Sequence, residues 1–116
     1  MAGIIISIGG LFGFFGVAAA AYSAHGSADS RLTSAVALIL LAHAPALVAL
    51  ASHLPRSKAI AIAIVLIIVG ASLFSGDVML KALGREGLFW RAAPTGGIAL
   101  MAGWLAVVVA GFLHRG

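Results

Sequence analysis

The chain has 116 residues, 63% of them hydrophobic and 9% charged, with a formal net charge of +4. An ordinary soluble domain is about 25% charged and roughly half apolar, so these proportions exclude a soluble fold. The absence of cysteine excludes disulfides, thiolate metal ligands and cysteine nucleophiles, and the few scattered positive charges predict no nucleic-acid partner.

Charged residues divide the sequence into four apolar windows, at 2–28, 32–55, 59–76 and 92–114. Each window supplies the roughly 18–25 residues that cross the hydrocarbon core of a bilayer. We predict an all-α fold, an antiparallel bundle of four transmembrane helices at about 2–22, 32–54, 59–82 and 94–113. These spans use nearly the whole chain, so we expect a single integral membrane domain over 1–116, a multi-pass protein of the bacterial inner membrane.

The first predicted helix is rich in small residues. Gly9 and Gly13 share one helical face, where they let a neighbouring backbone approach closely. The alanines before Ala24 resemble a signal-peptide cleavage site, but the segment has no basic start and exceeds the usual ~7–15 apolar residues of a signal peptide. We therefore expect this helix to be retained.

The second predicted helix carries His43 near its middle. Pro45 has no backbone N–H, so the carbonyl of Leu41 loses its usual partner and the helix is expected to bend there. A neutral imidazole can donate to such a carbonyl or accept from a hydroxyl on the third helix. We favour this structural role; the alternative is a proton relay or ligand, because histidine titrates near neutrality.

The third predicted helix changes to small and hydroxylic residues in its second half, where Ser72, Ser75 and Gly76 are expected to be buried. Asp77 precedes Lys81 by four residues, the order that favours a helical ion pair. At ~1.5 Å per residue, Asp77 lies roughly 10 Å from the middle of the membrane. We favour an interfacial carboxylate paired with Lys81; the alternative is a substrate or proton site.

The fourth predicted helix follows a turn at 84–87 and has Pro94 in its first turn. Trp90, just before the helix, is expected at the membrane interface, where its amphipathic ring is favoured. This helix also contains four residues that are predicted to pack against other helices: Gly96, Gly97, Gly103 and Trp104.

Antiparallel threading brings the polar ends of the four helices to one membrane face. This polar face is predicted to hold His25, Arg31, Asp77, Lys81, Trp90, Arg91 and Thr95. With His43 added from deeper in the bundle, the candidate polar site consists of His25, His43, Asp77, Lys81, Arg91 and Thr95. The two histidines differ in depth by ~17 Å, too much for a bis-histidine haem, and we expect no cofactor and no metal.

Lys and Arg in the loops set the orientation of a membrane protein. The face with both termini holds three Lys or Arg residues and the polar face holds four, so this rule does not decide which face lies in the cytoplasm. The acidic residues Asp29, Asp77 and Glu86 all lie at the polar face, and we expect both termini in the cytoplasm.

Four short motifs carry a resemblance to a known family. They are Ala24-His25-Gly26, Ala42-His43-Ala44, Phe74-Ser75-Gly76, and Pro94-Thr95-Gly96-Gly97 leading to Gly103-Trp104. In these motifs and their order the chain resembles the small membrane proteins grouped as domain of unknown function 423, which include the transmembrane protein 256 group. The resemblance covers essentially the whole chain.

This resemblance implies a four-helix integral membrane protein without an agreed activity, and it adds no catalytic residue. The chain departs from the family pattern twice. The usual Ser-Gly-Ser of the third helix is here Ser75-Gly76-Asp77, and the usual Thr-Pro before the paired glycines is here Ala93-Pro94. Both departures fall at the polar face.

Three classes of function are compatible with the sequence. We favour a non-enzymatic bundle that acts as an accessory, scaffold or lipid-binding protein, with membrane lipids, further copies of itself or a larger membrane complex as partners. The alternative is a small transporter or an ion or proton pathway that uses Asp77 and His43. An enzyme is least favoured, because no nucleophile, base and orienting group form a recognisable constellation.

Overall fold

The computed structural model describes residues 1–26 and 28–114, so Ser27, Arg115 and Gly116 lie outside the described part. Within that part the chain forms four α-helices and one short 3-10 turn. They are α1 (Ala2–His25), α2 (Ser30–Ala51), η1 (Leu54–Arg56), α3 (Lys58–Ala82) and α4 (Ala92–Leu113). All four α-helices are long and apolar enough to cross a membrane, which confirms the predicted all-α transmembrane bundle.

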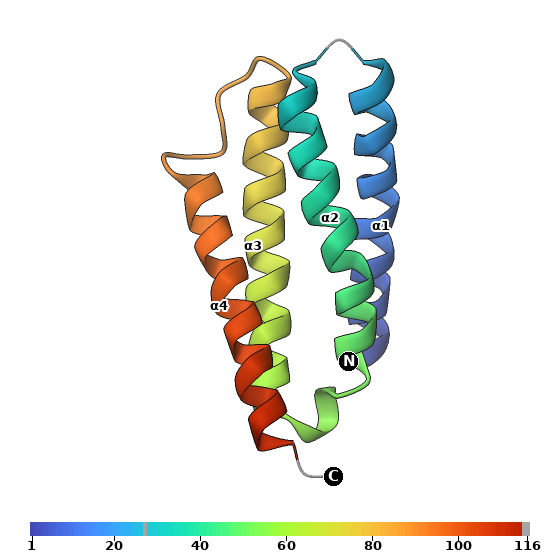
Figure 1. Ribbon diagram of the computed structural model, residues 1–116, viewed down its shortest axis with the longest axis vertical. Helices are drawn as coiled ribbons and strands as arrows, with labels where there is room; N and C mark the ends of the chain where they lie inside the picture. The colour runs from blue at the N-terminus through green and yellow to red at the C-terminus, as the bar shows by residue number, and fades with distance from the viewer. Residues whose placement is uncertain (27, 115–116) are drawn as a thin grey trace.

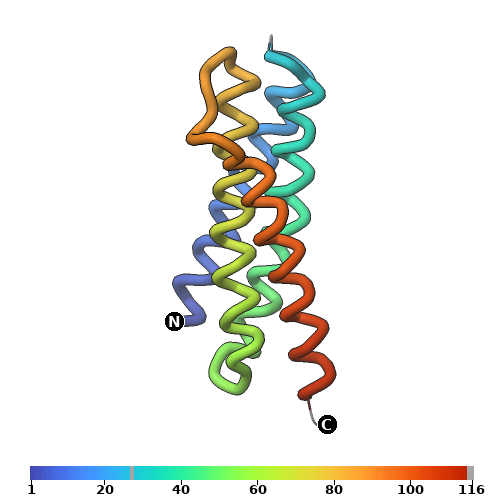
Figure 2. The backbone as a smooth tube through the Cα atoms, turned by 90° about the vertical axis from the view of Figure 1, so that its left-hand side faces the viewer, coloured from blue at the N-terminus to red at the C-terminus, as the bar shows by residue number. Residues whose placement is uncertain are grey.

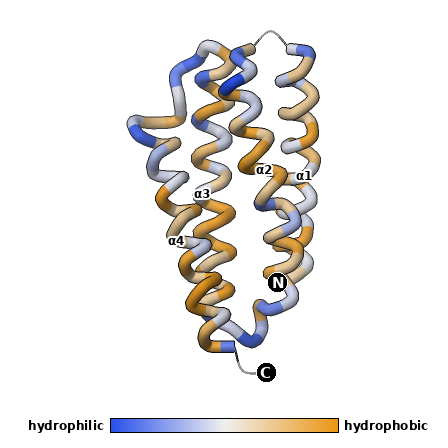
Figure 3. Tube along the Cα trace, in the orientation of Figure 1, coloured by the Kyte–Doolittle hydropathy of each residue, from blue (hydrophilic) through white to orange (hydrophobic). Residues whose placement is uncertain are grey.

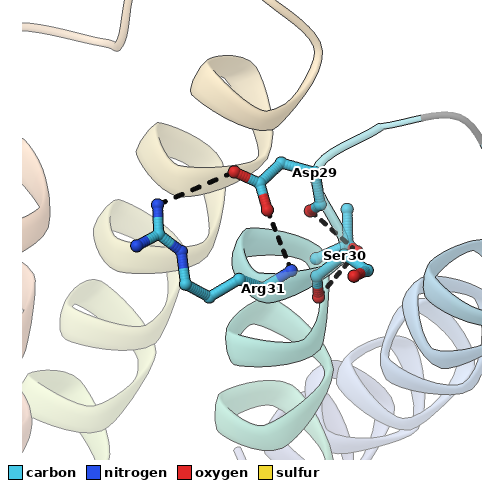
Figure 4. Close-up of polar contacts among 4 residues, drawn as sticks. Asp29, Ser30 and Arg31 are labelled. Atoms are coloured by element: carbon cyan, nitrogen blue, oxygen red, sulfur yellow. Dashed lines mark hydrogen bonds and ion pairs between the residues drawn. The ribbon is translucent and has the colours of Figure 1, made fainter.

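The helix boundaries differ from the predicted ones by up to three residues. α2 begins at Ser30 because the Asp29 carboxylate accepts the backbone N–H of Arg31 at 3.0 Å and caps the helix (Figure 4). α2 ends at Ala51, and the chain then forms the separate turn η1, with Pro55 at its second position, rather than another turn of the helix. Pro45 lies inside α2 without ending it.

Helices that follow one another in the chain also pack against one another. α1 packs on α2, α2 on α3 and α3 on α4, and Figure 1 shows them in chain order across the molecule. The two central helices hold the most deeply buried side chains, including Leu47 on α2 and Ile64 and Ile67 on α3. Within the described residues α1 and α3 have no extensive contact, so α2 lies between them.

Glycines set the close approach inside each outer pair. A Cβ on Gly9 would lie 3.0 Å from the Ala44 carbonyl oxygen on α2, and one on Gly96 would lie 2.6 Å from the Gly70 carbonyl oxygen on α3. A backbone can come this near only where no side chain intervenes. The predicted packing role of these glycines is therefore present in both helix pairs.

The other predicted packing glycines divide into close contacts and open positions. A Cβ on Gly103 would lie 3.0 Å from Ile67 Cγ1, and one on Gly76 would lie 3.3 Å from Leu88 Cδ1, whereas Gly13 leaves ordinary space at 3.6 Å. A Cβ on Gly97 would meet nothing within 4 Å. Gly97 therefore makes no close contact with another helix within the described residues, because α3 approaches α4 on the face that Gly96 presents.

The two ends of the bundle differ in character. The start of α1 and the end of α4 lie at one end, and the ends of α1 and α3 and the start of α2 lie at the other (Figures 1 and 2). Figure 3 shows hydrophilic residues at this second end and along the α3–α4 connection, and also in the η1 turn at the first end. The connection descends along the flank before α4 begins (Figure 1), so the polar face reaches below the tip of α3.

Candidate functional site

Asp77 on α3 is fully buried, with 0% of its surface exposed. Its carboxylate accepts the backbone N–H of Leu88 at 2.8 Å and of Ala93 at 3.2 Å. The ammonium of Lys81 lies 3.0 Å from Oδ2, so the predicted ion pair is present. The carboxylate differs from the prediction in being enclosed by protein, where three donors satisfy a charge that would otherwise be costly to bury.

The α3–α4 connection wraps around this carboxylate. Gly87 passes so close that a Cβ there would collide with Asp77 Oδ1. Arg91 ends the connection in the left-handed conformation, with φ of 64°, which is uncommon for a residue with a side chain. Asp77 thus holds the connection at the amide of Leu88 and the first turn of α4 at the amide of Ala93. We call this set the Asp77 clamp: Asp77, Lys81 and the amides of Leu88 and Ala93.

His43 joins α2 to α4 near the middle of the bundle. Its Nδ1 donates to the carbonyl of Ile39 at 2.7 Å, and its Nε2 accepts the indole N–H of Trp104 at 3.0 Å. These two bonds together require a neutral imidazole protonated on Nδ1. The bonds fit the structural role, but both partners differ from the prediction, because Ile39 stands in place of Leu41 and an indole in place of a hydroxyl on α3.

The cations of the polar face engage separate local partners. Arg31 lies 3.7 Å from the Asp29 carboxylate at the start of α2 (Figure 4). The Arg91 guanidinium lies 4.5 Å above the ring of Trp90, and this indole is 82% exposed. An exposed aromatic ring beside a cation is suited to the headgroup region, as predicted for Trp90.

The six residues of the candidate polar site therefore do not converge. His25 is exposed at the end of α1, and Thr95 is exposed in the first turn of α4. Polar contacts within the described residues join only Asp77 and Lys81 among the six. Antiparallel threading places such residues at one membrane face, but it does not bring their side chains into contact.

A groove lies between α1 and α3 in the half of the bundle next to the polar face. Its volume is about 480 Å³, and α2 forms its floor with the buried side chains Val36 and Leu40. The α1 wall consists of Phe12, Phe15, Ala18, Ala19 and Tyr22, and the α3 wall consists of Ser72, Ser75, Gly76, Met79 and Leu83. The groove exists because α2 keeps the two walls apart.

The α3 wall of this groove carries hydroxyl groups. Ser75 is 7% exposed, and its Oγ has no hydrogen-bond partner among the described residues. Ser72 lies one turn earlier on the same wall and is exposed. A buried hydroxyl without a partner costs about 1–3 kcal/mol, so the position of Ser75 calls for an explanation.

Sequence reasoning missed the groove although it recorded some of its residues. Ser72, Ser75 and Gly76 share one helical face by their spacing, and small residues on one face predict helix packing. Ser75 is buried as expected, but Ser72 is exposed and the face borders a gap. The missing signal is the order of helices in space, since the sequence does not say that α1 and α3 are separated by α2.

Groups that could hold a metal are sparse. The described residues contain no cluster of three or more His, Cys, Asp or Glu side chains. His53 and His114 approach one another at the opposite end of the bundle, with ring centroids 6.5 Å apart. Two imidazoles alone are fewer ligands than a protein metal site uses.

Comparison with known proteins adds one finding. The profile of a family described as "Protein of unknown function (DUF423)" matches residues 19–97. No curated protein and no solved structure matches the chain. The matched segment includes the end of α1, all of α2 and α3 and the start of α4. Because it covers well over half of the chain, the chain belongs to the DUF423 family of proteins of unknown function.

Proposed function

We propose that this protein is a non-enzymatic membrane protein that binds a membrane lipid in the groove between α1 and α3. The groove itself is the observation that carries the proposal. Its volume of about 480 Å³ falls in the roughly 300–1,000 Å³ range of ligand pockets. Its floor and its α1 wall are apolar, which suits a hydrocarbon chain.

The position of the groove supports a lipid as the occupant. The groove runs along helices that are long and apolar enough to cross a membrane. Its rim includes the exposed side chains Phe15, Tyr22 and Leu83, whereas its floor is buried. An acyl chain that leaves the bilayer for this groove exchanges lipid contacts for a fixed apolar surface, without crossing water.

The proton or ion pathway suggested by the sequence has less support. Asp77 already satisfies its carboxylate with two amides and an ammonium. His43 uses both ring nitrogens in hydrogen bonds. Either group would have to break these bonds before it could carry a proton or hold an ion.

The proposal extends to the surroundings of the protein. We place it in the bacterial inner membrane, with membrane lipids as its first partners, and it can act there as an accessory or scaffold for further copies or a larger complex. The exposed apolar faces of α1 and α4, which include Phe14 and Leu105, are compatible with such contacts.

Filling the groove tests the proposal. Ala18 lines the groove from an exposed position, and Ala20 is exposed on the same helix but does not line it. In nanodiscs of defined phospholipid analysed by native mass spectrometry, we expect the unmodified protein to retain one lipid. Ala18→Trp should reduce the retained fraction by about tenfold or more, and Ala20→Trp should leave it unchanged.

Two results would contradict the proposal. One is an unmodified protein that emerges without any retained lipid. The other is equal retention by Ala18→Trp and Ala20→Trp. Far-ultraviolet circular dichroism of both variants checks that each has kept its helices, so that loss of lipid is not loss of fold.

A further inference from the structure

We infer that the groove selects an ester-linked glycerophospholipid, with the Ser75 hydroxyl donating a hydrogen bond to an ester carbonyl of the lipid. The inference rests on the proposed lipid-binding function and names the chemical class of its ligand. Ser75 is the starting point, because its hydroxyl is buried, borders the groove and lacks a partner among the described residues.

The unpartnered hydroxyl calls for an acceptor on the occupant. A serine hydroxyl donates one hydrogen bond and accepts others, and a hydrocarbon chain offers neither an acceptor nor a donor. The ester carbonyl of a glycerolipid is an acceptor joined directly to an acyl chain. The same molecule can therefore fill the apolar floor at Val36 and Leu40 and satisfy the hydroxyl on the α3 wall.

The depth of Ser75 agrees with an ester. The charge-free run 59–76 spans ~27 Å at ~1.5 Å per residue, close to the ~30 Å thickness of the hydrocarbon core. Ser75 lies in the last turn of that run, two residues before Asp77, in the half of the core next to the polar face. Ester linkages of glycerolipids lie between the acyl chains and the headgroups, at the edge of that same half.

A competition between two lipids tests the inference. Nanodiscs are prepared with equal amounts of ester-linked phosphatidylglycerol and its diether analogue with the same headgroup and chain length. Native mass spectrometry separates the two retained lipids by mass. We expect the unmodified protein to retain the ester lipid about threefold to tenfold over the ether lipid, the range that one hydrogen bond provides.

Matched variants assign the preference to the hydroxyl. Ser75→Ala should retain the two lipids equally, whereas Ser52→Ala, an exposed serine bonded to Ala49 at the other end of α2, should keep the ester preference. A lipid-free Ser75→Ala protein should unfold at the same or a higher denaturant concentration, because the change removes an unpartnered hydroxyl. A purely structural serine would show the opposite result.

The outcomes separate this inference from the proposed function. Equal retention of both lipids by the unmodified protein, with Ala18→Trp still blocking retention, overturns the role of Ser75 and leaves lipid binding intact. A preference for the ester lipid that survives in Ser75→Ala also overturns it. A dimer that Ala18→Trp abolishes would identify a helix of a second copy as the occupant and overturn both proposals.

Discussion

At the scale of single residues, the deeply placed polar groups are held by complete sets of hydrogen bonds. Asp77 and His43 are at most 6% exposed, yet each reactive atom of both side chains has a partner. A membrane interior offers no water to replace a lost bond, so such groups persist only where the protein supplies the partners. Ser75 departs from this pattern, which is why it points to a ligand.

The Asp77 clamp makes a prediction about the α3–α4 connection. Asp77→Asn removes the charge and turns one acceptor oxygen into an amide donor, so one of the two backbone amides loses its partner. We expect the variant to lose about 1–3 kcal/mol of unfolding free energy. Hydrogen exchange should show faster exchange at the amides of Leu88 and Ala93 than in the unmodified protein.

Glu86→Gln is the matched control for this change. It makes the same chemical replacement at an exposed acid in the same connection. Exchange at the two clamped amides should stay as in the unmodified protein. Unchanged protection in Asp77→Asn would show that the carboxylate does not hold the connection.

At the scale of helices, adjacent glycines on α4 have opposite surroundings. A Cβ on Gly96 would lie 2.6 Å from the Gly70 carbonyl oxygen and 2.7 Å from the Phe74 nitrogen, both backbone atoms that cannot rotate away. A Cβ on Gly97 would meet open space. The sequence Gly96-Gly97 thus combines a packing contact with a position that tolerates a side chain.

These surroundings predict opposite effects for one substitution. Gly96→Ala should destabilise the protein by about 1–3 kcal/mol, because α3 and α4 must move apart. Gly97→Ala should be neutral or stabilising by up to about 1 kcal/mol, because alanine favours the helix. Unfolding by denaturant in detergent micelles measures both, and equal effects would refute the close contact of α3 with α4.

The helices were predictable because hydropathy and charge determine where a chain can cross a bilayer. The errors in the predicted boundaries arose at the helix ends, because local hydrogen bonds and turns determine where a helix begins and ends. The Asp29 cap starts α2 two residues before the predicted position, and α2 ends at Ala51, three residues before the predicted end, which lies in η1. Helical spacing also predicted the pair Asp77 and Lys81, since both residues lie in one helix.

The rest of the candidate site depends on contacts between helices. The bond from Trp104 to His43 joins residues 61 positions apart, and no periodicity within α2 or α4 indicates it. The amides that enclose Asp77 come from the backbone of the connection and of the first turn of α4, and backbone amides have no side-chain signature. The groove follows from the separation of α1 and α3, a property of the helix order in space.

At the scale of the whole molecule, the helices make two tight pairs joined through the centre. α1 with α2 and α3 with α4 are the outer pairs, and α2 with α3 is the junction. An even number of spans places the start of α1 and the end of α4 at one end (Figure 2). The turn η1 lies at that end and the α3–α4 connection at the other (Figure 1).

This arrangement predicts the labelling pattern of introduced cysteines. The natural chain has none, so His53→Cys and Glu86→Cys, both at exposed positions, give single sites at opposite ends. With the termini in the cytoplasm, a membrane-impermeant thiol reagent added to intact cells should label position 86 and spare position 53. The reverse pattern would show that the termini lie outside the cytoplasm, and labelling of both positions would contradict the four spans.

The groove opens along the flank of the bundle, towards the acyl chains of the bilayer. A molecule can therefore enter and leave by lateral diffusion, and so can the tail of a detergent. The proposed lipid binding therefore predicts that detergent extraction exchanges the bound lipid for detergent, and that a purified sample shows no lipid in the groove. Extraction into polymer-bounded bilayer patches avoids this exchange, and it is the form in which the native occupant should be identified.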